Sequence, residues 1–234
     1  MNEVNRRDLV GFDPKHFGKK RDRGVVFDPL DAFQEAFRSN LWGGASRSGP
    51  GSTTGQTGRI RAALPALCHR LGVRRLLDVP CGDFSWMAHV DLGGATYVGA
   101  DIVPEIVEMN RRTHARADRE FMELDITTSR LPPADLILCR DCLVHFSNAH
   151  VRAALLNIAQ SQISWLLTTT FPNEPHNVDI VTGDWRPIDL SKPPFGLPQP
   201  IELLNEGCTE QHGLFSDKSL GLWPASALAD LAAS

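Results

Sequence analysis

The sequence predicts an α/β fold, in which helices cover both faces of a mostly parallel sheet. Three observations predict it. Short apolar runs typical of buried strands recur between residues 75 and 171, amphipathic stretches with helical spacing separate them, and the first three runs end in aspartate. Strands that alternate with helices form βαβ units, and the strands of such units run parallel and are buried on both faces.

Two helices are expected before the first strand. One begins at Asp28-Pro29, because aspartate is a preferred N-cap and proline is favoured at the first helical position. A loop rich in glycine and serine follows over residues 43–58, and apolar residues at helical spacing then predict a helix over 60–71. We expect the first of these helices to form an N-terminal cap on the sheet.

The alternating part of the chain supplies the remaining elements. Strands are predicted over 75–79, 96–101, 121–126, 135–139 and 165–171. Helices are predicted from Pro104 and over 151–159. The tail is rich in proline and contains a strand-like segment over 220–223, which we expect to close the sheet edge as part of an antiparallel hairpin.

The composition is that of an ordinary globular protein. The chain has 234 residues, of which 42% are hydrophobic and 22% charged, and it is long enough to bury a substantial core. Residues 1–24 are polar and show no apolar period. We therefore expect a flexible polar leader over 1–24 and a single domain over 25–234, which includes the cap helix and the C-terminal hairpin.

Charge and cysteine content exclude several classes of protein. The net charge of −4 argues against broad binding to nucleic acid or membrane surfaces. No apolar run is long enough to span a bilayer, and the N-terminus lacks the apolar core of a signal peptide. The five cysteines fit reduced thiols in the cytoplasm. Cys139 and Cys142 have no second pair to complete a zinc site, so no metal is expected.

Each of the first three predicted strands has an aspartate at its carboxyl end. They are Asp78, Asp101 and Asp125. In an open parallel sheet, ligands bind at the carboxyl ends of the strands. A carboxylate after the second strand is well placed to accept hydrogen bonds from ribose hydroxyls, which makes Asp101 the candidate for that role. Asp125 can accept a hydrogen bond from an adenine amino group.

The loop after the first strand, residues 78–86, distinguishes between nucleotide ligands. A dinucleotide enzyme needs the pattern G-x-G-x-x-G there, because the pyrophosphate lies against glycine backbone. Only Gly82 is present. The loop disfavours a nicotinamide oxidoreductase and favours a ligand without phosphate groups.

Four segments resemble successive motifs of class I S-adenosylmethionine-dependent methyltransferases: LLDVPCGDFSWM, YVGADIVPEIVEMN, FMELDI and DLILCRDCLVHFS. More narrowly, they are similar to a bacterial subgroup with the first motif D-x-P-C-G-D-F-x-W-M, over residues 29–225. The resemblance implies a Rossmann-like seven-stranded sheet and S-adenosylmethionine as cofactor, with S-adenosylhomocysteine as product.

The resemblance also implies which residues hold the cofactor. Gly82 and its neighbours would line the methionine part, Asp101 would hold the ribose, and Asp125 with Ile126 would frame the adenine. The serine hydroxyls of residues 46–52 suit a carboxylate. The predicted cofactor-binding residues are Trp42, Ser48, Asp78, Pro80, Gly82, Asp101, Ile102, Asp125, Ile126 and Arg140.

The segment after the fourth strand is where this family faces the transferred methyl. Here it contains Asp141 and His145, four residues apart, so on a helical turn they would share one face. A carboxylate can orient the acceptor, and histidine is suited to proton removal near neutral pH. Asp141 and His145 are therefore the predicted catalytic residues, although a helix-face histidine bonded to backbone is an equally ordinary reading of His145.

The acceptor is expected to be a small polar molecule. From residue 120 onward, fourteen Asp and Glu face six Lys and Arg. This acidic balance favours a nitrogen of an amine or guanidino compound, such as free arginine, because carboxylates pair with guanidinium groups. Asp141, Glu174, Asp179, Asp184 and Glu206 are the candidate contacts, unless they are solvated surface residues. Methylation of an oxygen on a sugar or secondary metabolite is the alternative, and a non-catalytic cofactor-binding module is a second one.

Overall fold

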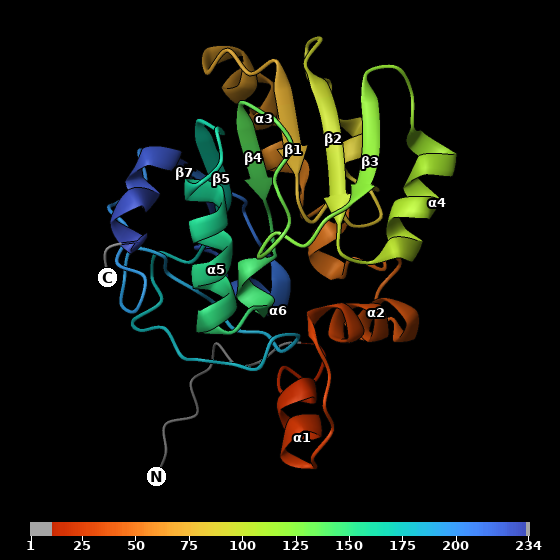
Figure 1. Cartoon of the computed structure of the whole chain (residues 1–234), viewed down its shortest axis with the longest axis vertical. Coiled ribbons are helices and arrows are strands. Elements are labelled where there is room, and N and C mark those ends of the chain that lie inside the picture. The colour runs from red at the N-terminus through yellow and green to blue at the C-terminus, as the bar shows by residue number, and fades with distance from the viewer. Residues whose placement is uncertain (1–10, 233–234) are drawn as a thin grey trace.

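The computed structural model describes residues 11–232, and it contains a seven-stranded sheet in the order β3-β2-β1-β4-β5-β7-β6 (Figure 1). The strands are β1 (Arg75–Asp78), β2 (Thr96–Asp101), β3 (Arg119–Glu123), β4 (Leu136–Cys139), β5 (Trp165–Thr170), β6 (Glu202–Asn205) and β7 (Ser219–Pro224). The first five strands are parallel, whereas β7 runs antiparallel to β5 and β6. The predicted α/β, Rossmann-like sheet is confirmed, and so is its antiparallel C-terminal hairpin.

The central strands are apolar on both faces, which explains their position in the sheet. Leu77 and Ile137 face the core that contains helix α5 (Asn148–Ala159), whereas Leu76 and Leu138 face the core that contains helix α3 (Gly58–Arg70). These side chains are fully buried. Parallel strands need such cover on both sides, because each face of the strand carries apolar residues.

Local signals in the sequence set the helix ends. Helix α2 (Pro29–Ser39) begins with a capping box, in which Asp28 accepts from the backbone N–H of Asp31 at 2.8 Å, and it ends at Asn40 in the left-handed conformation. Helix α4 (Pro104–His114) begins at its proline. The helices expected after Asp28, from Pro104 and over 60–71 and 151–159 are therefore present.

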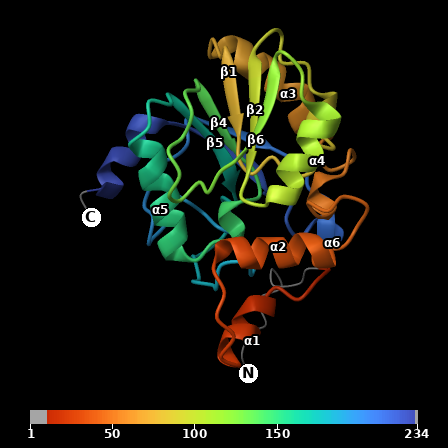
Figure 2. The same ribbon diagram turned by 45° about the vertical axis from the view of Figure 1, so that its right-hand side comes forward.

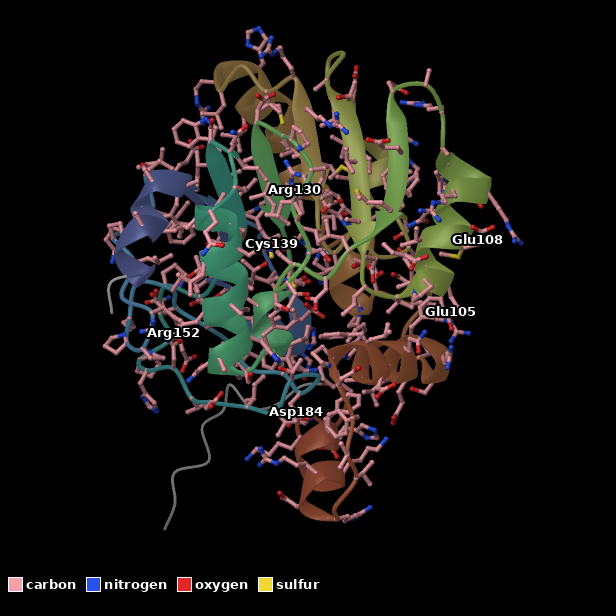
Figure 3. The ribbon with its side chains drawn as sticks, viewed as in Figure 1. Glu105, Glu108, Arg130, Cys139, Arg152 and Asp184 are labelled. Atoms are coloured by element: carbon pink, nitrogen blue, oxygen red, sulfur yellow. The ribbon has the colours of Figure 1, made fainter. Side chains whose placement is uncertain are left out.

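Helix α2 lies across the end of the sheet at which the parallel strands finish (Figures 1 and 2). Arg38 and Gln34 of α2 both bond to the carboxylate of Glu105 in α4, with Nε of Arg38 at 2.7 Å and Nε2 of Gln34 at 3.2 Å. Glu105 lies at the end of α4 that adjoins α2 (Figure 3). This contact joins the cap helix to α4, and the N-terminal cap on the sheet that the sequence predicted is present.

Several element boundaries differ from the sequence-based expectation by one to three residues, and two differences matter most for the argument. Strand β3 ends at Glu123, so Asp125 lies beyond it. The strand stops there because the Asp125 carboxylate accepts hydrogen bonds from the next turn, including the backbone N–H of Thr127 at 2.8 Å. The turn after β3 therefore positions Asp125, and the strand does not.

The second difference concerns the expected flexible leader over 1–24. Residues 1–10 lie outside the described residues, but His16–Asp22 form helix α1. Phe17 is fully buried, and the backbone N–H groups of Phe17 and Gly18 donate to the Asp184 carboxylate at 2.7 and 3.0 Å. The sequence did not predict this packing, because it depends on one phenylalanine and two backbone N–H groups within a segment that is otherwise polar.

Candidate functional site

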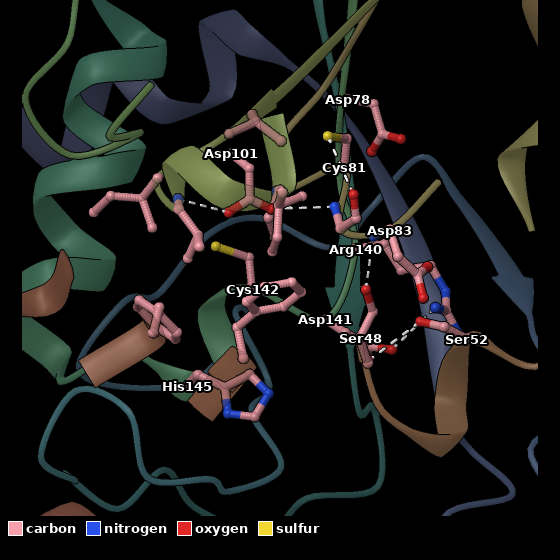
Figure 4. A pocket seen from close by; sticks show the side chains of 18 of the residues that line it. Ser48, Ser52, Asp78, Cys81, Asp83, Asp101, Arg140, Asp141, Cys142 and His145 are labelled. Carbon is pink, nitrogen blue, oxygen red and sulfur yellow. Dashed lines mark hydrogen bonds and ion pairs between the residues drawn. The ribbon is translucent and has the colours of Figure 1, made fainter. Parts of the chain in front are cut away.

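A cavity lies at the carboxyl end of the parallel strands, between the sheet and α2; we call it the first cavity (Figure 4). Its walls come from the loop after β1, the ends of β2 and β3, the segment after β4, and residues 46–52, which we call the serine-rich loop. The structure brings together in it every residue predicted to bind the cofactor and both predicted catalytic residues: Trp42, Ser48, Asp78, Pro80, Gly82, Asp101, Ile102, Asp125, Ile126, Arg140, Asp141 and His145.

The serine-rich loop is fastened to the loop after β1. Ser46 Oγ donates to the Asp83 carboxylate at 2.7 Å, and the Asp83 backbone N–H donates to Ser48 Oγ at 3.0 Å. Gly82 lies at this contact with φ of +53°, and a Cβ there would lie 2.2 Å from Ser48 Oγ. Gly82 is thus required for the close approach of the two loops.

Asp101 at the end of β2 is buried and faces the same loop (Figure 4). Its two oxygens accept from the backbone N–H of Gly82 at 3.1 Å and of Val103 at 3.0 Å. Burial raises the pKa of its carboxyl to about 6, although these backbone donors oppose the rise. A carboxylate has about four lone-pair sites, so Asp101 retains capacity to accept from a ligand.

Asp78, at the end of β1, is also buried. Tyr97 donates its hydroxyl to Asp78 at 2.6 Å. Burial raises the pKa of the Asp78 carboxyl to about 7, against the opposing effect of the tyrosine hydrogen bond. Asp78 is therefore a group that titrates near neutral pH at the base of the first cavity.

A buried cluster of charges follows β4. Arg140 forms two hydrogen bonds with Glu206, at 3.1 and 2.7 Å, and lies 3.2 Å from the Asp141 carboxylate. Lys218 lies 2.6 Å from Asp141 and 3.6 Å from Glu206. Burial disfavours the ionised form of Asp141, but the charges of Arg140 and Lys218 outweigh it and hold the pKa of that carboxyl below its ordinary value.

Asp141 is held in an unusual backbone conformation. Its φ is +52°, which is uncommon for a residue other than glycine. Its backbone N–H donates to the Thr169 hydroxyl at 2.8 Å. Asp141 and His145 therefore do not share a regular helical turn, as the sequence suggested, because η4 (Leu143–His145) is a short 3-10 turn that begins only after Asp141.

His145 stacks against Trp42, with ring centroids 4.9 Å apart. Its Nδ1 lies 3.0 Å from the carbonyl oxygen of Asp184. A carbonyl oxygen can only accept, so Nδ1 carries the hydrogen and Nε2 keeps its lone pair. Burial lowers the pKa of His145 to about 4, so the ring is neutral at physiological pH and can receive a proton at Nε2.

Most of the acidic residues predicted to contact the acceptor lie outside the first cavity. Glu206 pairs with Arg140, and the Asp184 carboxylate accepts from the backbone of α1. Asp179 accepts from the backbone N–H of Asn148 at 2.8 Å. Glu174 is buried outside the first cavity. Of the five candidates, only Asp141 lies in its wall.

Sequence reasoning missed Lys218, which is the buried partner of Asp141. A single lysine before a strand resembles any surface lysine, and only the antiparallel return of β7 brings it beside β4 and β5. Tyr97 was also missed, because a tyrosine within an apolar strand gives no sign that its hydroxyl will reach Asp78.

Residues 77–161 match the model of a methyltransferase domain family. The matched segment spans β2, β3, β4, α4 and α5. The domain match and the confirmed fold together support the prediction of a class I methyltransferase that uses S-adenosylmethionine. The narrower resemblance to one bacterial subgroup stays a prediction.

Comparison with solved structures finds similarity at low sequence identity. Human N-acetylserotonin methyltransferase in complex with S-adenosylmethionine aligns with a TM-score of 0.50 and 13% identity, over 83% of this chain and 64% of that chain. The methyltransferase domain of a bacterial Hen1 aligns with a TM-score of 0.41 and 9% identity, over 49% of this chain and 66% of that one. This chain thus spans just under two thirds of the length of both. No curated protein sequence matches it.

Two further observations concern the described part of the chain. No helix within residues 11–232 has the length and apolar character needed to cross a membrane. Among the same residues, no group of three or more His, Cys, Asp or Glu side chains is arranged to hold a metal ion. The five cysteines are buried free thiols, so Cys139 and Cys142 contribute packing.

Proposed function

We propose that this protein is an S-adenosylmethionine-dependent methyltransferase that acts on a small polar acceptor. One observation carries the proposal. A buried carboxylate after β2 and the glycine-containing loop after β1 line one cavity, in a chain whose residues 77–161 match a methyltransferase domain. This is the end of a parallel sheet at which nucleoside ligands bind.

The residues of the first cavity fit this cofactor. Asp101 would accept from the ribose hydroxyls, Asp125 from the adenine amino group, and Gly82 with Ser48 would lie along the methionine part. The indole N–H of Trp42 is buried in the cavity wall and lacks a hydrogen-bond partner among residues 11–232. A bound ligand with acceptor atoms would satisfy it, because a buried unpaired donor is costly.

When bound, S-adenosylmethionine supplies an activated methyl group that a nucleophile can take while the sulfur keeps the bonding electrons. The protein then has to align the acceptor, exclude water and receive a proton. Asp141 is positioned for alignment, since Arg140, Lys218 and Thr169 fix its carboxylate and backbone. His145 Nε2 is the acceptor for the proton that the methylated atom releases.

The acceptor atom we propose is nitrogen, in an amine or guanidino compound such as free arginine. The low pKa of His145 supports this choice, because so weak a base takes a proton from a neutral hydroxyl only with difficulty. An amine that enters as its ammonium form, with a pKa of about 10, gives up a proton more readily than a neutral hydroxyl does, and the freed lone pair then attacks the methyl.

A labelled-methyl assay tests the proposed function. The protein is incubated with S-adenosylmethionine labelled in its methyl group and a panel of amines, guanidines, amino acids and sugars, and the products are analysed by mass spectrometry. We expect label on nitrogen of one class of amine or guanidine. Label on oxygen or carbon would refute the nitrogen assignment, and binding of the cofactor without transfer to any compound would support a non-catalytic module.

A further inference from the structure

A second cavity adjoins the first. The two share Trp42, Ser48, Asp141 and His145 in their walls. The second cavity has a volume of about 320 Å³, which lies within the range of small-molecule sites. Its lining includes Phe171, which follows β5, and Lys218, which precedes β7, but neither Asp101 nor Asp125.

Aromatic rings form much of the wall of the second cavity. Phe171 follows β5, and it packs edge-on against Trp185 and Phe215 with ring centroids 6.3 and 6.0 Å away. Trp185 and Phe215 are 5.1 Å apart and also nearly perpendicular. Trp42 contributes a further ring. Faces of such rings attract organic cations, most strongly where water is excluded.

The segment before α1 contributes to the wall of the second cavity. Gly11 and Phe12 lie in this wall. The segment is held there because the Trp185 backbone N–H donates to the Pro14 carbonyl at 3.1 Å and α1 is bonded to Asp184.

The charges at the second cavity do not cancel among the described residues. Arg140 and Lys218 are matched by Asp141 and Glu206, which leaves the carboxylate of Glu210. Glu210 receives a thiol contact from Cys208 at 3.6 Å and forms no ion pair within residues 11–232. His145 adds no positive charge, because burial keeps it neutral. The described wall thus carries one negative charge in excess.

Asp141, Lys218 and Glu210 lie close together around Gly51. A Cβ built on Gly51 would lie 3.3 Å from an Asp141 oxygen, 3.3 Å from Lys218 Nζ and 3.5 Å from a Glu210 oxygen. Glu210 is therefore close to the Asp141–Lys218 pair, and the aromatic rings line the same cavity.

We propose that the second cavity is the acceptor site and that it selects a positively charged organic group, an ammonium or a guanidinium, by means of Glu210 and the surrounding rings. This inference rests on the proposed function and deepens it, because it names the residues that recognise the acceptor. Glu210 replaces Glu174 and Glu206 in that role, and it supplies a charge-assisted hydrogen bond that a neutral isostere of the acceptor would not form.

Matched probes in the full-length protein test this inference. The protein is saturated with S-adenosylhomocysteine, and binding is measured by titration with charged and neutral members of three pairs: arginine and citrulline, choline and 3,3-dimethylbutanol, butylamine and butanol. We expect at least one cation to bind at least tenfold more tightly than its neutral partner. Glu210→Gln should lower the affinity for that cation about 10- to 100-fold and leave S-adenosylhomocysteine binding unchanged.

The control variant is Glu202→Gln, which removes a glutamate that pairs with Arg70 on the surface of β6. It should bind the cation as the wild type does. If S-adenosylhomocysteine binds but no cation binds more tightly than its neutral partner, the inference is overturned and the proposed function still stands. Equal cation affinity in wild type and Glu210→Gln would overturn it as well. If S-adenosylhomocysteine itself fails to bind, the proposed function is wrong.

Discussion

The two cavities are built in different ways. Most of the first cavity comes from residues that directly follow consecutive parallel strands, between Asp78 and Ile126. The second is assembled from segments far apart in the chain, among them Phe12, Phe171 and Glu210. The topology of the sheet alone brings the first set together, whereas the second depends on how β7 and the N-terminal segment return to the sheet. A common cofactor site and an individual acceptor site are expected to differ in this way.

The largest effect is expected in the first cavity, at Asp101. Asp101→Ala removes two proposed hydrogen bonds from a charged group to the ribose, each worth about 1.5–3 kcal/mol. Calorimetry should therefore show S-adenosylmethionine affinity reduced more than 100-fold. Glu123→Ala, which removes an exposed carboxylate at the end of β3, is the control. An unchanged dissociation constant in folded Asp101→Ala would mean that the ribose lies elsewhere.

The charge cluster between the cavities should govern stability. Arg140→Met leaves the buried Glu206 and the half-buried Asp141 with only Lys218, and removing one partner of a buried ion pair costs about 3–5 kcal/mol. Urea unfolding measures this loss. Arg38→Met removes an exposed arginine that pairs with Glu105, and it should cost about 0–1 kcal/mol. Similar losses for both variants would show that the buried cluster contributes no special stability.

The wall shared by both cavities should control turnover. We expect His145→Ala to lower turnover about 100-fold, as is typical when a general base is lost, with a much smaller change in cofactor affinity. Steady-state kinetics with the acceptor found in the labelled-methyl assay provides the measurement. His69→Ala at the exposed end of α3 serves as control. Full turnover of His145→Ala at saturating acceptor would remove the proposed role.

Asp141→Asn should also lower turnover more than cofactor affinity. The substitution preserves the shape of the side chain but removes the charge that Arg140 and Lys218 face. The acceptor would then be aligned less well, and the effect should appear at saturating cofactor. If Asp141→Asn instead lost only affinity for S-adenosylmethionine, Asp141 would belong to the cofactor site.

The pH dependence of stability provides a further test, whose effect per pH unit is smaller than those above. Burial raises the folded-state pKa of Asp78 to about 7, above the unfolded value of about 4. The folded carboxyl therefore binds its proton more tightly, and its contribution to stability is lost as the pH rises through this window. Between about pH 4 and 7, the wild type should therefore lose stability relative to Asp78→Asn. The difference between their free energies of unfolding should change by up to ~1.4 kcal/mol per pH unit. A difference that does not vary with pH would contradict the raised pKa.

The contrast between the cavities also explains what the sequence could predict. Alternating apolar runs and helix signals such as Asp28-Pro29 were sufficient for the fold, because they are local. Asp78, Asp101 and Gly82 could be found because each adjoins the end of a strand. The roles of Glu206 and Lys218 could not be predicted, since their charges meet Arg140 and Asp141 only after the C-terminal hairpin has formed.

The acidic balance after residue 120 illustrates the same limit. It suggested a cationic acceptor, but sequence position could not distinguish carboxylates with internal partners from one that faces a cavity. Asp179 and Asp184 bond to backbone N–H groups, and Glu206 bonds to Arg140. Glu210, which the sequence analysis did not select, is the carboxylate placed to meet a ligand.

The central claim is that the first cavity binds S-adenosylmethionine, and calorimetric titration tests it most directly. The full-length protein is titrated in parallel with S-adenosylmethionine and with NAD, the ligand that the single glycine of the β1 loop disfavours. We predict saturable binding of one S-adenosylmethionine per chain and no measurable heat with NAD. Binding of NAD, or no binding of S-adenosylmethionine to the folded protein, would contradict the account.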